Sequence, residues 1–176
     1  MNTPNKLTLL RVLLIPVFLV LVYLPLPYHM LWALAAFIVA SLTDFADGKI
    51  ARSRGLVTDF GKFMDPLADK MLVMAALLCF VELGRMPAWA MLIVVVREFA
   101  VTALRLIAVE GGRVIAAGWS GKVKTASTMV CICLMLALTG FPALDLVCMA
   151  VILATTVYSG IEYFVKNKDV INWSDL

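Results

Sequence analysis

Four aspartates are the residues best suited to chemistry, because they interrupt segments that are otherwise apolar. They form two pairs, Asp44 with Asp47 and Asp65 with Asp69. An aspartate at the centre of a membrane-spanning helix costs about 2.5 to 3.5 kcal/mol, so four of them require compensation. At about 100° per residue, members three or four positions apart share one helix face. Two facing helices would therefore bring the four carboxylates together.

Carboxylate oxygens without cysteine or histidine ligands favour a hard cation, Mg²⁺ or Mn²⁺, and four such groups are enough for two ions. An alternative is that the aspartates form buried salt bridges that only hold the helices together. The available cations for this are Lys49, Arg52, Lys62 and Lys70. A divalent-cation transporter is a third interpretation. It predicts carboxylates on several helices, whereas these four fall on two adjacent ones.

Small residues flank both aspartate pairs. Gly48 and Ala51 follow the first pair, and Gly61 precedes Asp65 by one turn. Such residues let a bulky ligand approach the backbone. Arg52 lies one turn beyond Gly48, where its guanidinium could pair with a phosphate that the metals also bind. The arrangement is typical of a diphosphate site.

The composition predicts that these residues are carried by an all-α integral membrane protein. The 176 residues are 63% hydrophobic and 15% charged, with a mean hydropathy of +0.99, which is far from a soluble domain. Apolar runs of about 20 residues predict transmembrane helices. We expect six of them in a single domain over residues 1–176, with the ranges 7–24, 30–46, 61–81, 87–109, 119–139 and 143–165.

The cations predict the topology. Lysine and arginine gather at both termini and in alternate connections, while the intervening turns at 25–29, 82–87 and 140–144 contain Arg85 as their only cation. The positive-inside rule then places both termini, and the active site, on the cytoplasmic side of the inner membrane. Because the positive charge is spread over many loops, we expect contact with anionic lipid headgroups and no nucleic-acid partner.

The aspartate pattern resembles the signature of the CDP-alcohol phosphotransferases. All eight fixed positions are present in Asp44-x2-Asp47-Gly48-x2-Ala51-Arg52-x8-Gly61-x3-Asp65-x3-Asp69. The resemblance implies a six-helix membrane fold, usually a homodimer, in which the aspartates bind two divalent ions. By this analogy Asp44, Asp47 and Asp65 are chiefly metal ligands, and Asp69 at the same centre is the general base. Gly48, Ala51, Arg52 and Gly61 would form the CDP site.

Further motifs resemble the branch of this family that makes phosphatidylglycerol phosphate. That branch transfers a phosphatidyl group from CDP-diacylglycerol to sn-glycerol 3-phosphate and releases CMP. The motifs span nearly the whole chain: Asn5-x2-Thr8-x2-Arg11 as possible supporting residues, Arg97-Glu98, Arg105, Gly121-Lys122-x-Lys124-Thr125 and Ser159-Gly160-x2-Tyr163. Other acceptors, namely serine, inositol phosphate or phosphatidylglycerol, remain alternatives.

Charge supports a phosphorylated acceptor, which requires cations that a neutral alcohol does not. Arg97, Arg105, Lys122 and Lys124 lie toward the predicted cytoplasmic ends of 87–109 and 119–139. Arginine offers a fork of donors to a phosphate, and lysine offers a point charge. The competing interpretations are an ion pair of Arg97 with Glu98, and lysines that serve only topology.

Overall fold

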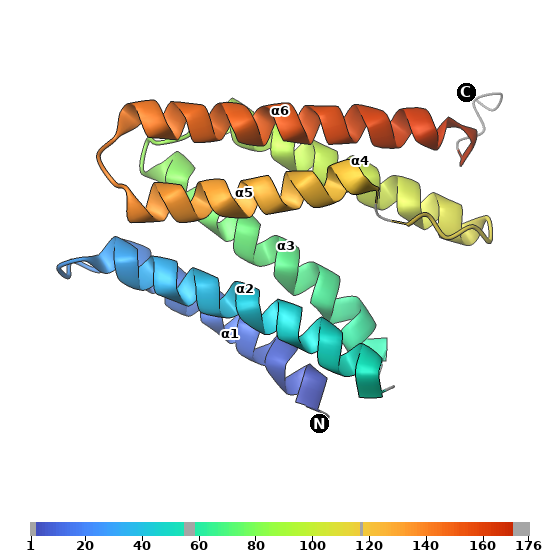
Figure 1. Ribbon diagram of the computed structural model, residues 1–176, viewed down its shortest axis with the longest axis horizontal. Coiled ribbons are helices and arrows are strands. Elements are labelled where there is room, and N and C mark those ends of the chain that lie inside the picture. Colours follow the sequence, from blue (N-terminus) through green and yellow to red (C-terminus); the bar gives the residue numbers. More distant parts are fainter. Residues whose placement is uncertain (1–2, 55–58, 117, 171–176) are drawn as a thin grey trace. The chain divides into compact units, whose positions relative to one another are not determined.

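The computed structural model describes residues 3–54, 59–116 and 118–170; within these ranges the side chains of 3–8, 44–54, 59–66, 68 and 69 are not described. The described part is all-helical, as predicted, and has no strand (Figure 1). In chain order its elements are α1 Thr3–Tyr23, α2 His29–Arg54, α3 Asp59–Glu82, α4 Ala88–Glu110, α5 Trp119–Ala137, α6 Pro142–Lys166 and the short 3-10 helix η1 Lys168–Val170.

The observed helix boundaries lie near the predicted ones, with one large difference. We predicted that the second helix ends with the apolar run at residue 46, but α2 continues to Arg54. The added segment is polar, yet it contains no proline and is rich in lysine, arginine and alanine, which are good helix formers. The first aspartate pair and the small residues after it therefore lie on one continuous helix.

The chain forms two compact units, and each is described by itself. The first comprises Met1–Leu83 with Ile132–Phe141, and the second comprises Gly84–Cys131 with Pro142–Leu176. In the first unit α1 packs on both α2 and α3. The rings of Phe18 and Phe37 meet in a tilted arrangement with their centroids 6.0 Å apart. The Tyr23 hydroxyl donates to Glu82 Oε2 at 2.5 Å, which joins the end of α1 to the end of α3.

In the second unit α4 packs along α6. Val101 and Leu104 of α4 form a buried cluster with Tyr163 of α6. At the start of the unit, Arg85 donates from Nε to Asp145 Oδ2 at 2.9 Å and from Nη2 to Oδ1 at 2.5 Å. This bidentate pair connects the turn before α4 to the first turn of α6. The one cation of the intervening turns thus faces a carboxylate.

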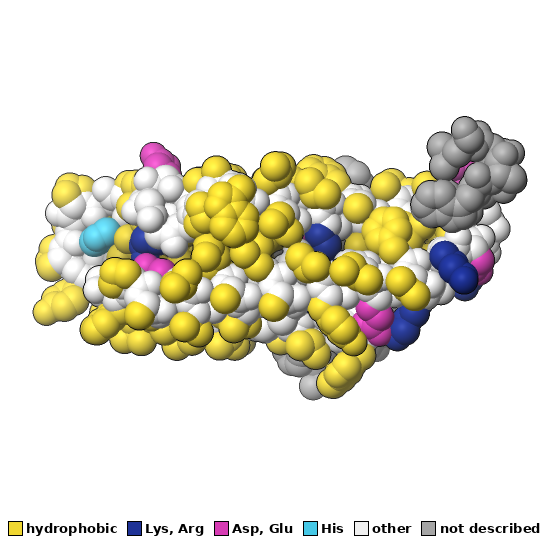
Figure 2. Space-filling model, turned by 90° about the horizontal axis from the view of Figure 1, so that it is seen from above, with side chains coloured by type: hydrophobic (Ala, Val, Ile, Leu, Met, Phe, Trp, Pro, Cys, Tyr) yellow, Lys and Arg dark blue, Asp and Glu magenta, His cyan; other side chains and the backbone are white. Residues whose placement is uncertain are grey.

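Long apolar helices with little burial are typical of segments that face lipid. Among the described residues, α5 and α6 are long and apolar enough to cross a membrane, and only 28% of the apolar window of α6 is buried. Shorter apolar stretches run over Leu9–Tyr23 and His29–Thr43. Large hydrophobic side chains such as Val20, Trp32 and Ile161 are exposed, and yellow side chains dominate the visible face in Figure 2. Six membrane crossings and their orientation stay predictions.

Candidate active site

The two aspartate pairs are carried by α2 and α3, which belong to the same unit. Asp47 lies seven residues before the end of α2, and Asp65 lies six residues after the start of α3. At about 1.5 Å per residue, each is roughly 10 Å from the connection between the helices. The end of α2 and the start of α3 lie at one end of this unit, near the start of α1 (Figure 1). The backbone thus gives the two pairs similar depths.

The side chains of this motif lie outside the described residues. That holds for Asp44, Asp47, Asp65 and Asp69, for the CDP-site candidates Gly48, Ala51, Arg52 and Gly61, and for Asn5 and Thr8 on α1. Four carboxylates on neighbouring helices are a donor set of the kind that hard divalent cations prefer, so Mg²⁺ or Mn²⁺ fits these residues chemically. Arg11 is described, and its side chain is fully buried on α1.

Three charged side chains of the second unit form a hydrogen-bonded network. Glu98 Oε1 accepts from Arg97 Nη1 at 2.8 Å and from Lys124 Nζ at 2.6 Å. The side chains of Arg97 and Glu98 are each 13% exposed and that of Lys124 is 7% exposed, so little water screens them. The network connects α4 to α5. The predicted ion pair of Arg97 with Glu98 is therefore present.

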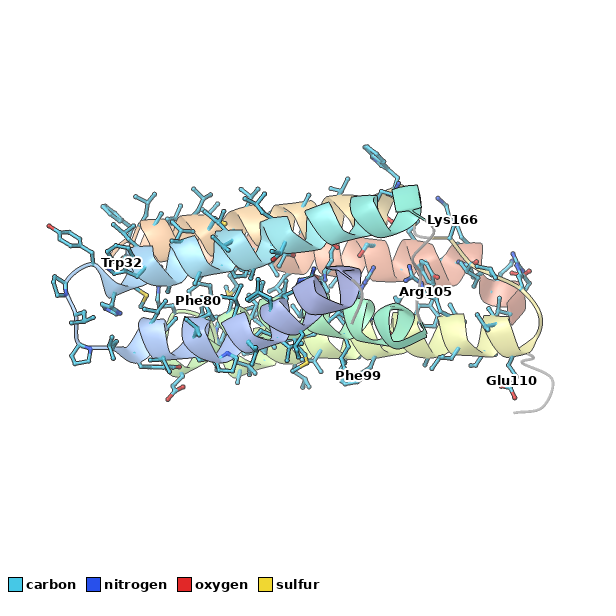
Figure 3. The ribbon with its side chains drawn as sticks, turned by 90° about the horizontal axis from the view of Figure 1, so that it is seen from below. Trp32, Phe80, Phe99, Arg105, Glu110 and Lys166 are labelled. Carbon is cyan, nitrogen blue, oxygen red and sulfur yellow. The ribbon has the colours of Figure 1, made fainter. Side chains whose placement is uncertain are left out.

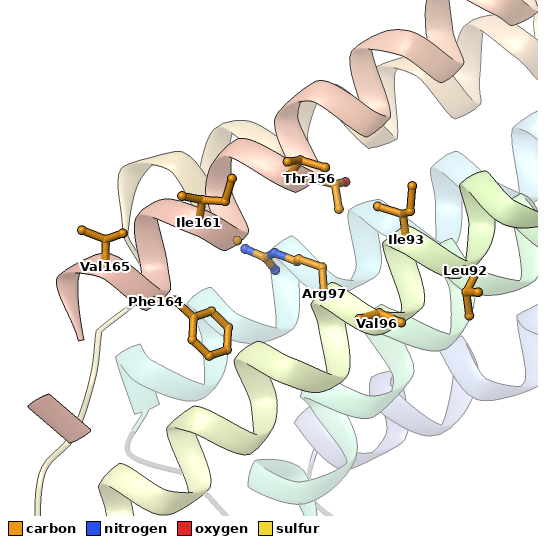
Figure 4. Close-up of a pocket in the computed structure, with 10 residues that line it drawn as sticks. Leu92, Ile93, Val96, Arg97, Thr156, Ile161, Phe164 and Val165 are labelled. Atoms are coloured by element: carbon orange, nitrogen blue, oxygen red, sulfur yellow. The ribbon is translucent and has the colours of Figure 1, made fainter. Parts of the chain in front are cut away.

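The Arg97 side chain extends from α4 toward α6 (Figure 4). Two glycines border it: a Cβ built on Gly160 would lie 3.2 Å from Arg97 Cγ, and one on Gly121 would lie 3.8 Å from Nη2. The Nε of Arg97 is buried and has no hydrogen-bond partner. Arg97 also lines a cavity of about 560 Å³ between α4 and α6, whose other walls include Val96, Ile161 and Phe164. A buried N–H donor without a partner is a place where an anion gains a hydrogen bond.

The other two predicted acceptor cations have different surroundings. Arg105 Nε donates to the hydroxyl of Tyr163 at 2.8 Å, and its guanidinium lies 5.4 Å from the centroid of the Tyr163 ring. Arg97 and Arg105 thus both contact α6. Figure 3 shows Arg105 near the end of α4 that carries Glu110. Lys122 is exposed at the start of α5.

Comparison with known proteins identifies the family. The sequence profile of the CDP-alcohol phosphatidyltransferases matches residues 1–158. The chain belongs to this family. It is 41% identical to a Bacillus subtilis CDP-diacylglycerol–glycerol-3-phosphate 3-phosphatidyltransferase over 99% of both chains. It is 40% identical to a probable phosphatidylglycerophosphate synthase of Mycobacterium tuberculosis over 94% of this chain and 81% of the relative. An Escherichia coli phosphatidyltransferase with the same name as the Bacillus enzyme is 41% identical over 73% of each chain.

Sequence reasoning assigned no role to several residues of this phosphatidyltransferase that the structure connects to the candidate cations. Gly160 and Tyr163 appeared only as parts of motifs, Glu98 was considered only as an ion-pair partner of Arg97, and Asp145 was not singled out. A signal was present in the sequence: Glu98 and Asp145 are charged residues inside apolar spans, the same property that drew attention to the aspartates. The missing information was the partners Lys124 of Glu98 and Arg85 of Asp145, which lie 26 and 60 positions away.

Proposed function

We propose that this chain transfers the phosphatidyl group of CDP-diacylglycerol to sn-glycerol 3-phosphate, giving phosphatidylglycerol phosphate and CMP. The observation that carries the proposal is the 41% identity to the Bacillus subtilis enzyme named for this reaction, over 99% of both chains. The complete aspartate signature supports it, because each fixed position of the signature is occupied in this sequence. Membrane helices suit a donor whose two acyl chains stay in the bilayer.

In this proposal the aspartates of α2 and α3 hold two divalent ions, chiefly through Asp44, Asp47 and Asp65. Bound Mg²⁺ or Mn²⁺ supplies electrostatic stabilisation of the donor diphosphate and of the departing CMP. Asp69 accepts the proton of the acceptor hydroxyl. The hydroxyl oxygen then forms a bond to the phosphorus attached to diacylglycerol, and the bond from that phosphorus to the CMP oxygen breaks. Gly48, Ala51, Arg52 and Gly61 position the CDP group.

The phosphate of the acceptor is assigned to the cations of the second unit. Arg97 and Lys124 are held near each other by Glu98, and Arg97 has a buried N–H without a partner. Arg105 lies further along the same helix, and Lys122 is exposed and free to reach a ligand at the membrane surface. Asn5, Thr8 and Arg11 of α1 are proposed as supporting residues. Holding the acceptor phosphate orients its hydroxyl, which is the main requirement of this type of transfer.

We further propose that all six helices cross the inner membrane, with both termini and the active site on the cytoplasmic side, and that the enzyme is a homodimer. The supporting observations are the alternation of basic and uncharged connections and the apolar, exposed faces of the helices. Reporter fusions at the end of each connection test the topology, and cross-linking of the purified protein tests the dimer.

The decisive experiment is an acceptor assay with the purified protein in detergent micelles that contain CDP-diacylglycerol. Radiolabelled glycerol 3-phosphate, serine, inositol phosphate and phosphatidylglycerol are supplied in turn, with Mg²⁺ or Mn²⁺. We expect labelled lipid and stoichiometric CMP only with glycerol 3-phosphate. Transfer to another acceptor would refute the proposed acceptor and assign the chain to a different branch of the family. Metal flux into vesicles without CMP release would instead support a transporter.

A further inference from the structure

Glu98 lies between a cation of α4 and a cation of α5 and binds both of them. One oxygen of this carboxylate, Oε1, accepts from both Arg97 Nη1 and Lys124 Nζ. The distance between Arg97 Nη1 and Lys124 Nζ is therefore at most the sum of the two hydrogen-bond lengths, about 5.4 Å. All three side chains are at least 87% buried. Two cations this close, with so little water between them, would repel each other strongly if the carboxylate were absent.

The Arg97 guanidinium keeps hydrogen-bonding capacity while it is bound by Glu98. Its bond to Glu98 uses Nη1, whereas Nε is buried without a partner. Arginine carries five N–H donors in a rigid fork, so fixing one of them fixes the direction of the others. The side chain is also confined by the backbone of α6 at Gly160, whose missing Cβ leaves room for Arg97 Cγ. Glu98 and Gly160 together allow Arg97 little freedom.

We infer that Glu98 is a positioning residue that holds Arg97 and Lys124 as one preformed site for the phosphate of the acceptor. This inference rests on the proposed function, in which these cations receive glycerol 3-phosphate. Glu98 itself touches no substrate in this scheme, because a carboxylate repels a phosphate. Its effect is to keep both cations in place before the acceptor arrives, so that the substrate does not have to bring them together.

Net charge and positioning predict opposite effects of a neutral residue at position 98. Glu98→Gln removes a negative charge beside the site and keeps the side-chain shape. If only net charge mattered, phosphate would bind more tightly to the variant and KM for glycerol 3-phosphate would fall. If Glu98 positions the cations, they separate in the variant and KM rises. We expect a rise of about tenfold or more, in keeping with the loss of a charge-assisted hydrogen bond to each cation.

The experiment measures kcat and both KM values for the wild type, Glu98→Gln and Glu98→Asp in micelles. Glu110→Gln is the matched control, because Glu110 is exposed on the same helix and points away from it in Figure 3. Inhibition by inorganic phosphate, competed against glycerol 3-phosphate, provides a binding readout that does not depend on turnover. We expect Glu98→Gln to raise KM for glycerol 3-phosphate and the inhibition constant of phosphate together, with KM for CDP-diacylglycerol within about twofold of the wild type. Glu98→Asp, which keeps the charge, should recover part of the loss.

Three results would overturn the inference. One is a lower KM for glycerol 3-phosphate in Glu98→Gln, and another is an equal change in the KM values of donor and acceptor. The third combines two observations: Glu98→Gln yields no folded protein, and Glu98→Asp has wild-type kinetics and a wild-type inhibition constant for phosphate. That combination would make the network purely structural. Failure of the wild type to use glycerol 3-phosphate is a separate outcome, which refutes the proposed function and removes the basis of the inference.

Discussion

Replacing Asp145 by asparagine is expected to destabilise the second unit, because it removes one partner of a desolvated ion pair. The Asp145 carboxylate accepts from Arg85 at 2.9 and 2.5 Å, and the two side chains are only 12% and 13% exposed. Breaking a buried pair from one side costs about 3 to 5 kcal/mol, since the remaining charge keeps its desolvation cost and loses this carboxylate. Because part of each side chain still reaches solvent, we expect about 3 kcal/mol. That corresponds to a change of more than a hundredfold in the unfolding equilibrium, since about 1.4 kcal/mol is tenfold.

Thermal unfolding in detergent can measure this effect. The four cysteines are free thiols, and Cys79, Cys131 and Cys148 are buried, so a dye that fluoresces on reaction with thiols reports their exposure. For a chain of this length, about 1 kcal/mol corresponds to roughly 2 to 4 °C, so Asp145→Asn should lower Tm by about 6 to 12 °C.

Two controls separate the ion pair from other effects of the substitution. Asp169→Asn removes a partner of Arg113 in a pair whose side chains are 58% and 52% exposed, and should lower Tm by no more than a few degrees. The double variant Arg85→Met, Asp145→Leu removes both charges and should recover most of the stability, because neither charge then has to be desolvated. The reasoning is refuted if Asp145→Asn unfolds within about 2 °C of the wild type, or if the double variant is no better than the single one.

The aspartate proposal and one surface ion pair yield three more predictions. Removing divalent metal with a chelator should abolish CMP release, and excess Mg²⁺ or Mn²⁺ should restore it; activity that survives chelation would count against metal at this site. Asp69→Asn should abolish transfer but leave CDP-diacylglycerol binding measurable in a radioligand assay, and equal loss of both would exclude a dedicated base role. The hydrogen bond from Arg113 holds the pKa of Asp169 below its ordinary value. Stability from this pair is therefore present above the unfolded pKa of about 3.9 and is lost as pH falls through the lower folded value, so the Tm difference between wild type and Asp169→Asn should shrink as the pH is lowered below the unfolded pKa.

The sequence by itself determined where the helices form, and it predicts the chemistry of the motif. Apolar runs interrupted by prolines and turns indicate where helices form, because backbone groups in an apolar solvent must satisfy one another within a helix. The four aspartates predict metal and phosphate chemistry from residue type and spacing alone. The end of α2 was missed by eight residues, because hydropathy marks where an apolar face ends and carries no information on how far the helix continues into polar sequence.

Only the tertiary structure decided which charged residues are partners. Helical spacing places Arg97 and Arg105 on one face, but it does not reveal that the first binds Glu98 beside Lys124 and the second binds Tyr163. Nor does it reveal that Arg85 is bound by Asp145. Apart from the adjacent pair Arg97 and Glu98, these contacts join residues 26 to 60 positions apart. They depend on which helices pack together and on small residues, such as Gly160, that let a long side chain lie against a neighbouring helix.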